Sequence, residues 1–328
     1  MHAVTVSEVG GPDVLTYNEV PIPVPGDAGV LIKSEAIGVN FIDTCFRSGL
    51  YPHPLPFSVG SEVCGTVVAV GRNVSTVQAG DRVASADAVG AYADYCVAPA
   101  ALVAHVPHAI GSEVAAAALL KGLTAHFLTK SVYQVKPGDT ILLHAGAGGV
   151  GLILTQWATS TGATMITTVS TPAKISLSRQ AGAAHVLDYP GESRQFGSLI
   201  SELTDGRGAA AVYDGVGRTT FDASLASLAV RGTLCLFGAT SGPVPPVDPQ
   251  RLSSAGSVYL TRPVRRDFNR TYDEFAWRVT ELFHAITDGR ITVTVGARYP
   301  LAHAAQAHRD LESRRTHGSV LLIPQAGS

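Results

Sequence analysis

The stretch TILLHAGAGGVG, residues 140–151, decides the fold of this chain. It begins with Thr140–His144, an apolar run of strand length, and continues into a glycine-rich turn. Beyond the turn, Ile153, Leu154 and Trp157 recur on one face of a helix. Strand, glycine turn and amphipathic helix in this order are typical of a loop that holds the pyrophosphate of a dinucleotide. We therefore expect these residues to bind a dinucleotide: Gly146, Ala147, Gly148, Gly149, Val150 and Gly151.

The three glycines of this GxGxxG pattern have separate expected tasks. Gly146 allows the tight turn, Gly148 lets the backbone approach the pyrophosphate, and Gly151 lets the helix close on the strand. The N-terminus of the helix then offers amide donors and a positive dipole end to the phosphates. Because the chain holds 34 glycines, the motif alone is weak evidence. The flanking strand and helix make it specific.

From Lys136 onward, short apolar runs alternate with helical patterns, which predicts βαβ units and a parallel sheet. Right-handed crossovers make such a unit a doubly wound α/β fold of the Rossmann type. The expected strands are Thr140–His144, Met165–Val169, Ala184–Leu187, Ala211–Tyr213, Thr233–Phe237 and Ser257–Leu260. The expected helices are Val150–Thr161, Pro172–Ala181, Ser193–Thr204, Thr220–Ala229 and Asp248–Ser254.

The flanking regions have a different pattern. The chain up to about Leu123 is rich in short strands such as Val63–Val70, punctuated by glycine and proline. The tail, Phe268–Pro324, mixes the two patterns, with helices expected at Tyr272–Thr287 and Ala302–Ser313 and strands at Ile291–Val295 and Ser319–Ile323. We therefore predict a Rossmann domain, residues 124–265, inserted into a β-rich domain formed by residues 1–123 and 266–328.

Composition narrows the class of protein. The 328 residues are 46% hydrophobic and 15% charged, enough apolar surface for two cores and unlike a disordered chain. The formal charge of −2 gives no general attraction to nucleic acid or an acidic membrane. No apolar run could span a bilayer and the N-terminus lacks a signal-peptide pattern, so we expect a cytoplasmic protein. The four cysteines form no CxxC pair, which favours reduced, buried thiols.

The second expected strand indicates which dinucleotide is bound. An NAD site usually has Asp or Glu at the end of this strand, to accept a hydrogen bond from the ribose 2′-hydroxyl. Here the strand runs into Ser170-Thr171-Pro172-Ala173-Lys174 without a carboxylate. Ser170 and Lys174 could instead hold a 2′-phosphate by hydrogen bond and charge. This pattern favours NADPH, although Lys174 could also be a solvated residue of the first helical turn.

Two positions argue against a catalytic metal. The segments around residues 40 and 61 resemble those in which zinc alcohol dehydrogenases carry their first Cys ligand and their His ligand. In this chain the two ligand positions hold Asn40 and Ser61. No pair of histidines has a ligand spacing beside a third plausible ligand. We therefore expect no metal, and without a Lewis acid alcohol oxidation is disfavoured.

Over its whole length the chain resembles the NADPH:quinone oxidoreductases, the zeta-crystallin-like, zinc-free family of the medium-chain dehydrogenase/reductase superfamily. The resemblance runs through the ordered segments Gly38–Thr44, Arg47–Pro52, Leu120–Thr124, His144–Gly151, Val212–Gly217, Thr261–Pro263 and Leu311–Arg314. It implies a GroES-like catalytic domain beside the Rossmann domain, a homodimer, and reduction of quinones without metal or flavin.

The resemblance also implies roles for single residues. Lys174, Tyr189 and Arg314 match positions around the adenosine 2′-phosphate, and Gly238 completes the expected cofactor-binding set. The matches to positions lining the nicotinamide and quinone pocket are Asn40, Tyr51 and Thr124. Cys45 departs from the family, since close relatives often have Tyr there, and this puts the substrate preference in doubt.

A quinone that accepts hydride becomes an anion and needs hydrogen-bond donors. Our candidates for these donors are the Asn40 amide and the Tyr51 hydroxyl, although Asn40 could equally stabilise its own turn. We interpret Asp43 as a structural hydrogen-bond acceptor, Lys121 as structural and Glu62 as securing the loop around Ser61.

Other functions stay open from the sequence. The nearest alternative is an NADPH-dependent reductase of enones or other activated double bonds, since a quinone is itself a doubly activated enone. A second is an NADPH-binding structural or RNA-binding protein, although the near-neutral charge argues against RNA. Zinc alcohol dehydrogenase comes last.

Overall fold

The computed structural model describes residues 1–325, and its internal contacts divide the chain into two units. Unit 1 comprises Met1–Lys121 and the chain from Thr271 onward, and unit 2 comprises Gly122–Arg270. In sequence, unit 2 is thus an insertion into unit 1. The limits predicted for the Rossmann domain, residues 124–265, remain a prediction of where an independently folding domain begins and ends.

Unit 2 is built on a six-stranded sheet in which every pairing is parallel. Its spatial order is β11-β10-β9-β12-β13-β14, the 3-2-1-4-5-6 order of dinucleotide-binding sheets. The strands are β9 (Thr140–His144), β10 (Thr164–Val169), β11 (His185–Asp188), β12 (Ala209–Asp214), β13 (Leu228–Leu236) and β14 (Tyr259–Thr261). The predicted doubly wound parallel sheet is confirmed.

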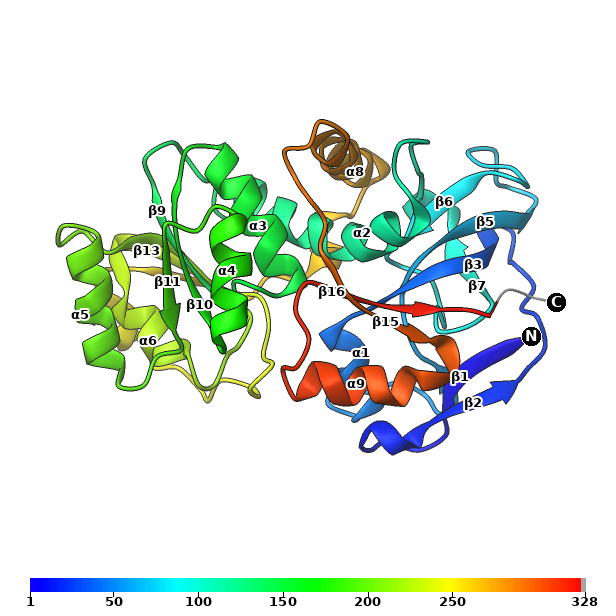
Figure 1. The fold of residues 1–328 in the computed structure, drawn as a ribbon, viewed down its shortest axis with the longest axis horizontal. Helices are drawn as coiled ribbons and strands as arrows, with labels where there is room; N and C mark the ends of the chain where they lie inside the picture. Colours follow the sequence, from blue (N-terminus) through cyan, green and yellow to red (C-terminus); the bar gives the residue numbers. More distant parts are fainter. Residues whose placement is uncertain (326–328) are drawn as a thin grey trace. The chain divides into compact units, whose positions relative to one another are not determined.

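Helices cover both faces of this sheet: α3 and α4 lie on one side, and α5 and α6 on the other (Figure 1). The helices of unit 2 are α3 (Gly149–Ser160), α4 (Pro172–Gln180), α5 (Ser193–Leu203), α6 (Phe221–Ala226), α7 (Gln250–Ser254) and the 3-10 turn Arg265–Phe268. On the face covered by α5 and α6, apolar side chains of the strands and these helices form one core, which includes Leu142, Ile166, Val212 and Leu234.

The helix predicted at Thr220–Ala229 is too long. α6 ends at Ala226 and β13 begins two residues later, at Leu228. The apolar residues Leu228 and Ala229 belong to the strand. The prediction failed here because an apolar run alone does not distinguish the end of a short helix from the start of a buried strand.

Helix α2 (Ser112–Phe127) leads from unit 1 into unit 2 and continues as a π-helical turn, Leu128–Val132. The hydroxyl of Tyr213, on β12, lies 3.1 Å from the carbonyl of Leu128 and 3.3 Å from that of Tyr133. A single buried phenol therefore satisfies carbonyls that the irregular turn leaves without a helical partner.

Unit 1 contains two sheets. The larger has the order β15-β16-β3-β5-β6-β8, with β7 also paired to β3, and all its pairings except β15–β16 are antiparallel. The smaller has the order β2-β1-β4. The strands are β1 (His2–Val6), β2 (Leu15–Glu19), β3 (Gly29–Val39), β4 (Phe57–Ser58), β5 (Glu62–Val70), β6 (Arg82–Ser85), β7 (Tyr95–Pro99), β8 (Val103–His105), β15 (Val295–Pro300) and β16 (Ser319–Ile323).

The helices of unit 1 are few. They are α1 (Phe41–Arg47), α8 (Tyr272–Thr287), α9 (Ala304–Glu312) and the 3-10 turns Pro12–Val14, Ala100–Leu102 and Leu301–His303. The strand predicted at Ile291–Val295 is misplaced, since β15 begins only at Val295. Ile291 is buried and its N–H bonds the Ala285 carbonyl, so this apolar residue closes the end of α8.

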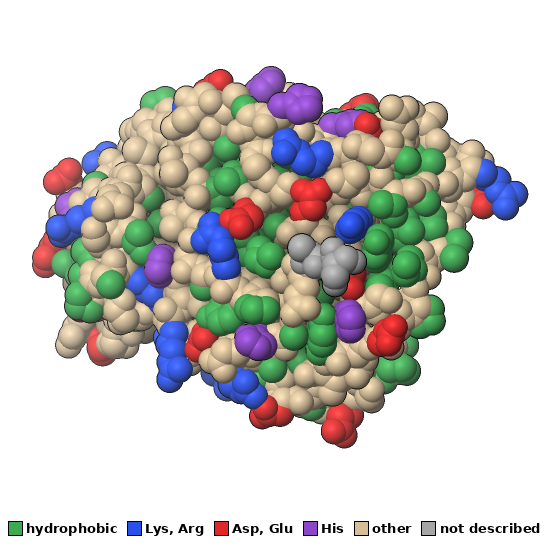
Figure 2. All heavy atoms as spheres, turned by 45° about the vertical axis from the view of Figure 1, so that its right-hand side comes forward, with side chains coloured by type: hydrophobic (Ala, Val, Ile, Leu, Met, Phe, Trp, Pro, Cys, Tyr) green, Lys and Arg blue, Asp and Glu red, His purple; other side chains and the backbone are tan. Residues whose placement is uncertain are grey.

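The face shown in Figure 2 carries scattered charges of both signs and no field of a single sign. Within residues 1–325, no helix is long and apolar enough to cross a membrane.

Candidate functional site

The phosphate loop joins β9 to α3 at the carboxyl edge of the parallel sheet. Gly148 is the N-cap of α3, which is 12 residues long, and no side chain caps this end. The turn is closed by a hydrogen bond from the Gly148 N–H to the Ala145 carbonyl. A helix N-terminus at the carboxyl edge of such a sheet is suited to bind phosphate.

The structure assigns different reasons to the three glycines of the motif. A Cβ on Gly151 would lie 2.3 Å from the Ala145 carbonyl oxygen, so Gly151 lets α3 close on the turn, as expected. Gly146 is required because its Cβ would lie 2.5 Å from the Thr167 side chain, not because of the turn. The left-handed residue of the turn is Ala145, with φ of 61°. At Gly148 the nearest atom would be 3.3 Å away. A Cβ at Gly148 would thus be closer to the Ala145 carbonyl oxygen than an ordinary van der Waals contact, so the turn itself favours glycine there.

Ser170 and Lys174 lie together at the end of β10. The Lys174 ammonium is 3.4 Å from the Ser170 hydroxyl, and residues 170–174 contain no carboxylate. Tyr189 follows β11, and its ring is stacked at 6.3 Å from that of His144. Gly238 follows β13, where a Cβ would lie 2.4 Å from the Gly215 carbonyl, which gives this glycine a packing role of its own.

A buried polar network joins side chains of β9, β10, β12 and α6 in unit 2, and sequence reasoning missed it. His144 contacts the Thr168 hydroxyl at 2.8 Å and the Ser224 hydroxyl at 3.0 Å. Ser224 donates to Asp214 at 2.7 Å. Asp214 also accepts hydrogen bonds from these donors: the N–H groups of Val216 and Gly217 and the Thr220 hydroxyl. Burial lowers the pKa of His144, which keeps its ring neutral.

In unit 1, Asn40 is the N-cap of α1 and is buried. Its backbone N–H donates to Asp43 at 2.8 Å, and its side-chain amide donates to Glu62 Oε2 at 2.9 Å. The same amide nitrogen donates to the Gly38 carbonyl at 3.4 Å, so one amide hydrogen is held closely by Glu62 and the other is held weakly inside the protein. The structure shows Asn40 as the residue that caps α1, and its role beside an electron acceptor stays a prediction.

The expectation for Glu62 was wrong. Its carboxylate does not secure the loop around Ser61 but lies fully buried in an ion pair with Lys121, at 2.7 Å. The Leu120 N–H donates to the other oxygen at 2.7 Å. Gly38 makes room for this group, since a Cβ there would lie 2.1 Å from Glu62 Oε2. Each oxygen of the buried carboxylate therefore has a donor, which a buried charge requires.

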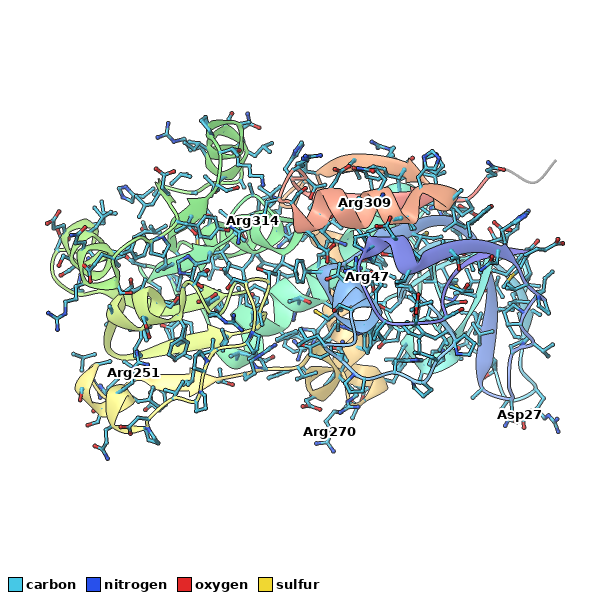
Figure 3. The ribbon with its side chains drawn as sticks, turned by 90° about the horizontal axis from the view of Figure 1, so that it is seen from below. Asp27, Arg47, Arg251, Arg270, Arg309 and Arg314 are labelled. Atoms are coloured by element: carbon cyan, nitrogen blue, oxygen red, sulfur yellow. The ribbon has the colours of Figure 1, made fainter. Side chains whose placement is uncertain are left out.

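The other candidates are spread over both units. Tyr51 lies after α1, its ring packs edge-on against Phe46, and its hydroxyl makes no hydrogen bond to any residue in 1–325. Thr124 is half-buried in the last turns of α2, in unit 2. Arg314 belongs to unit 1, where it follows the C-terminal end of α9 in the left-handed conformation, with φ of 59° (Figure 3).

A second buried network, which we call the α1–α9 network, joins Asp43, Tyr92, His308, Arg47 and Glu312. Tyr92 donates to Asp43 at 2.9 Å and lies 3.0 Å from His308 Nε2. Arg47, which lies beside α9 in Figure 3, is 3.3 Å from His308 Nδ1 and bonds both oxygens of Glu312. Sequence reasoning expected only Asp43 as a structural acceptor, because no spacing rule connects residues 47, 92 and 308.

The electrostatics of this network are set mainly by burial. Burial raises the pKa of Asp43 to about 7. Hydrogen bonds from Asn40 and Tyr92 and the charge of Lys121 oppose that rise, whereas the charge of Glu62 adds to it. Burial and the nearby Arg47 lower the pKa of His308 to about 3. His308 is therefore neutral near pH 7, and Asp43 titrates there.

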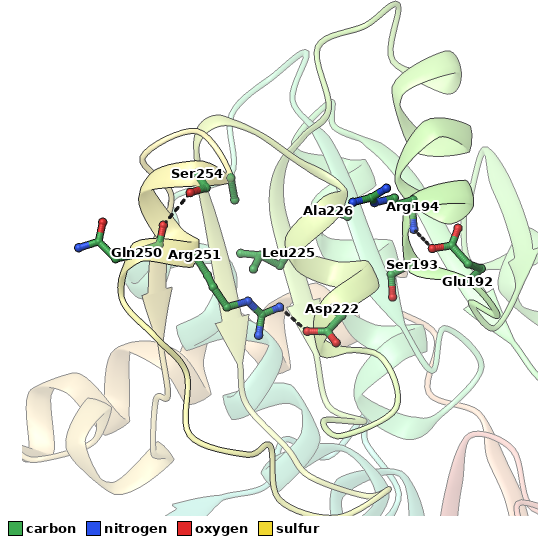
Figure 4. A pocket seen from close by; sticks show the side chains of 10 residues that line it. Glu192, Ser193, Arg194, Asp222, Leu225, Ala226, Gln250, Arg251 and Ser254 are labelled. Atoms are coloured by element: carbon green, nitrogen blue, oxygen red, sulfur yellow. Dashed lines mark hydrogen bonds and ion pairs between the residues drawn. The ribbon is translucent and has the colours of Figure 1, made fainter.

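Within residues 1–325, no group of three or more His, Cys, Asp or Glu side chains could hold a metal ion. A pocket of about 550 Å³ lies among α5, α6 and α7 (Figure 4). In this pocket Arg251 pairs with Asp222, and Glu192 accepts hydrogen bonds from the N–H groups of Arg194 and Gln195. It includes none of the expected site residues.

Comparison with known proteins identifies the family. Residues 26–108 match the family model described as alcohol dehydrogenase GroES-like domain, and residues 149–280 match that described as zinc-binding dehydrogenase. The chain is 45% identical over 317 residues to the quinone oxidoreductase of Pseudomonas aeruginosa, covering 96% of this chain and 97% of that protein.

Solved structures agree over the full length. A mycobacterial protein solved as a complex with NADPH is 66% identical, with a TM-score of 0.98 and coverage of 99% of this chain and 100% of that one. The Escherichia coli quinone oxidoreductase complexed with NADPH is 43% identical, with a TM-score of 0.96 and coverage of 99% and 100%. The GroES-like and Rossmann folds expected from the sequence are thus confirmed, and the chain belongs to the quinone oxidoreductase family of the medium-chain dehydrogenase/reductase superfamily.

Proposed function

We propose that this protein is an NADPH:quinone oxidoreductase, which reduces quinones by hydride transfer without a metal or a flavin. The observation that carries the proposal is the full-length identity of 43–45% to quinone oxidoreductases, with the phosphate loop intact in this chain. Bound NADPH supplies the hydride, and the protein supplies binding, orientation and electrostatics.

The residues of unit 2 fit this dinucleotide. The N–H groups at the start of α3 are suited to bind the pyrophosphate, because no side chain caps this end of the helix. Ser170 and Lys174 are suited to bind the 2′-phosphate, because a hydroxyl and an ammonium group replace the carboxylate of an NAD site. Tyr189, Gly238 and Arg314 are proposed as further cofactor contacts.

The acceptor is proposed to bind at Asn40, Tyr51 and Thr124. Asn40 is held at both ends, by Asp43 at its backbone and by Glu62 at its side chain. A donor that is already oriented stabilises developing negative charge without reorganising during the reaction. The Tyr51 hydroxyl has no described partner and can donate to an acceptor oxygen. Solvent can supply the proton that completes the hydroquinone.

The first test follows oxidation of NADPH and of NADH by the purified protein with an ortho-quinone, a para-quinone and a simple enone. We expect quinone-dependent oxidation of NADPH and weak activity with NADH. Turnover of the enone alone would contradict the proposal and indicate a double-bond reductase. NADPH binding without any turnover would indicate a binding protein.

Lys174→Ala tests the nucleotide preference. We expect the KM for NADPH to rise about tenfold, the value of one exposed charge–phosphate contact, with little change for NADH. Lys136→Ala, at an exposed lysine of unit 2, is the control. An unchanged KM for NADPH in Lys174→Ala would remove Lys174 from the site.

We also propose a homodimer formed through the sheet of unit 2. β14 is the last strand in the sheet order, and Tyr259 on it is exposed. An uncovered edge strand can pair with its copy across a twofold axis. Analytical sedimentation of the wild type and of Leu260→Pro measures whether the protein is a dimer. We expect the variant to lose the dimer, since proline has no N–H to donate to a β14 strand of a second copy.

A further inference from the structure

The α1–α9 network has a direction, which the chemistry of Arg47 determines. A guanidinium group only donates hydrogen bonds and keeps its protons. His308 Nδ1, 3.3 Å from Arg47 Nη1, must therefore be the acceptor nitrogen of a neutral ring. His308 then carries its proton on Nε2 and donates it to the Tyr92 oxygen, 3.0 Å away. The phenol proton of Tyr92 is left for Asp43.

Every donor in this series thus points toward the Asp43 carboxylate. Asp43 receives the Tyr92 hydroxyl and the backbone N–H of Asn40 on the same oxygen, Oδ2. Asp43, Tyr92, His308 and Arg47 are all at most 3% exposed. Asp43 in turn holds the backbone N–H of Asn40, the N-cap of α1, which we place at the hydride acceptor.

The network cannot conduct protons from the surface, because the permanently charged Arg47 lies between Glu312 and His308. Its effect must be orientational. The chain also leaves space for it, since a Cβ at Gly60 would lie 2.2 Å from the ring of Tyr92.

We propose that Tyr92 and His308 are positioning residues, which act through Asp43 to hold Asn40 in the orientation required at the hydride acceptor. The proposal rests on the proposed function for the role of Asn40. Misplacing a reacting group slightly lowers the rate of chemistry more than it lowers cofactor binding. The network therefore controls kcat and contributes little to NADPH affinity.

Tyr92→Phe tests this directly, because it removes only the hydroxyl that joins His308 to Asp43. We expect kcat with a quinone to fall about tenfold, while the Kd for NADPH and the KM for NADPH stay unchanged. Tyr213→Phe is the matched control, since it removes a buried hydroxyl of unit 2 that bonds backbone carbonyls instead of Asp43 and His308. Equal losses of kcat in the two variants, or a parallel rise in Kd for NADPH, would overturn the proposal.

The pH profile separates positioning from a general loss of stability. The Tyr92 hydroxyl lowers the pKa of Asp43, so its removal raises that pKa further above about 7. The groups facing Asp43 are Tyr92, Lys121 and Glu62, with His308 and Arg47 behind Tyr92. We expect the acid limb of kcat to move to higher pH in Tyr92→Phe and not in Tyr213→Phe. An unmoved limb would contradict the proposal.

Two variants of His308 supply a rescue test. His308→Gln keeps an amide N–H that can donate to Tyr92, whereas His308→Leu keeps none. We expect the Gln variant to retain several times the kcat of the Leu variant. Equal activity at equal thermal stability would show that the donor to Tyr92 is irrelevant.

A readout without turnover distinguishes failure of this proposal from failure of the proposed function. The side-chain amide signal of Asn40 in a ¹H–¹⁵N spectrum can be assigned with Asn40→Asp. We expect Tyr92→Phe to shift this signal and Tyr213→Phe to leave it in place. If the wild type turned over no quinone, the proposed function would fail and this shift would still decide whether the network positions Asn40.

Discussion

Both units contain a buried histidine that leads hydrogen bonds toward an aspartate, and the two networks differ at their ends. In unit 2, Ser224 gives its only proton to Asp214, so it must accept from His144. There the direction is determined by the anion. In unit 1, Arg47 can only donate, so the direction is determined by the cation.

The two aspartates are also satisfied differently. Asp214 accepts from two backbone N–H groups of the turn that follows its own strand and from two hydroxyls. Among residues 1–325, the donors to the Asp43 carboxylate are the Asn40 N–H and the Tyr92 hydroxyl, and burial raises its pKa to about 7. A local turn supplies enough donors for a buried carboxylate, whereas a long-range network supplies fewer and leaves a group that titrates near neutrality.

The largest expected effect comes from removing the better satisfied aspartate. Asp214→Ala leaves the N–H groups of Val216 and Gly217 without their acceptor, and we expect it to lower the free energy of unfolding by about 3–5 kcal/mol. Urea denaturation measures this loss. Asp222→Ala, at an exposed aspartate of the same unit, is the control and should change stability by less than about 1 kcal/mol. If Asp214→Ala lowered the free energy of unfolding only slightly, the N–H groups of Val216 and Gly217 would be hydrogen-bonded to water in the variant.

Asp43→Asn should have a smaller effect that depends on pH. The pKa of Asp43 is about 7 in the folded protein against 3.8 as an ordinary value, so its ionisation in the unfolded chain increasingly opposes folding as pH rises between these values. We therefore expect the free energy of unfolding of Asp43→Asn, relative to wild type, to increase by about 3 kcal/mol from pH 4 to pH 7.

The lowered pKa of His308 acts in the opposite direction, because it stabilises the fold above its unfolded pKa and that stabilisation is lost as pH falls. This contribution of His308 is present in the wild type and in Asp43→Asn, so it cancels when their free energies of unfolding are subtracted. Denaturation at several pH values checks the prediction, with Asp222→Asn as the control. A pH-independent difference would place the pKa of Asp43 in its ordinary range.

The smallest effect is expected at the outer end of the unit 1 network. Glu312 pairs with Arg47 at 2.7 Å, but its side chain is 32% exposed. Glu312→Gln keeps one oxygen for Arg47, which also donates to Gly10 and contacts His308. We expect a loss of about 0.5–1 kcal/mol in the free energy of unfolding, reduced further by salt. A loss as large as that of Asp214→Ala would show that Glu312, not Arg47, organises the network.

The contrast between local and long-range contacts also explains which parts of the structure could be predicted from the sequence. The Rossmann order, the phosphate loop and the ends of β9 and β16 follow from local apolar periods and glycine spacing, and all are found in the structure. The strand placed at Ile291–Val295 and the helix extended to Ala229 were wrong, because short apolar runs have no period long enough to distinguish strand, helix and cap.

By itself, the sequence determined the doubly wound sheet, the glycine loop and the absence of a carboxylate after β10, because each is encoded within one segment of the chain. Only the tertiary structure decided the partners of Asn40. Tyr92 and His308 are 216 residues apart, and Arg47 and His308 are 261 apart. Periodicity indicates which residues are buried, but a buried polar group finds its partner only when distant segments pack together, since that packing alone determines which donors lie within hydrogen-bond distance.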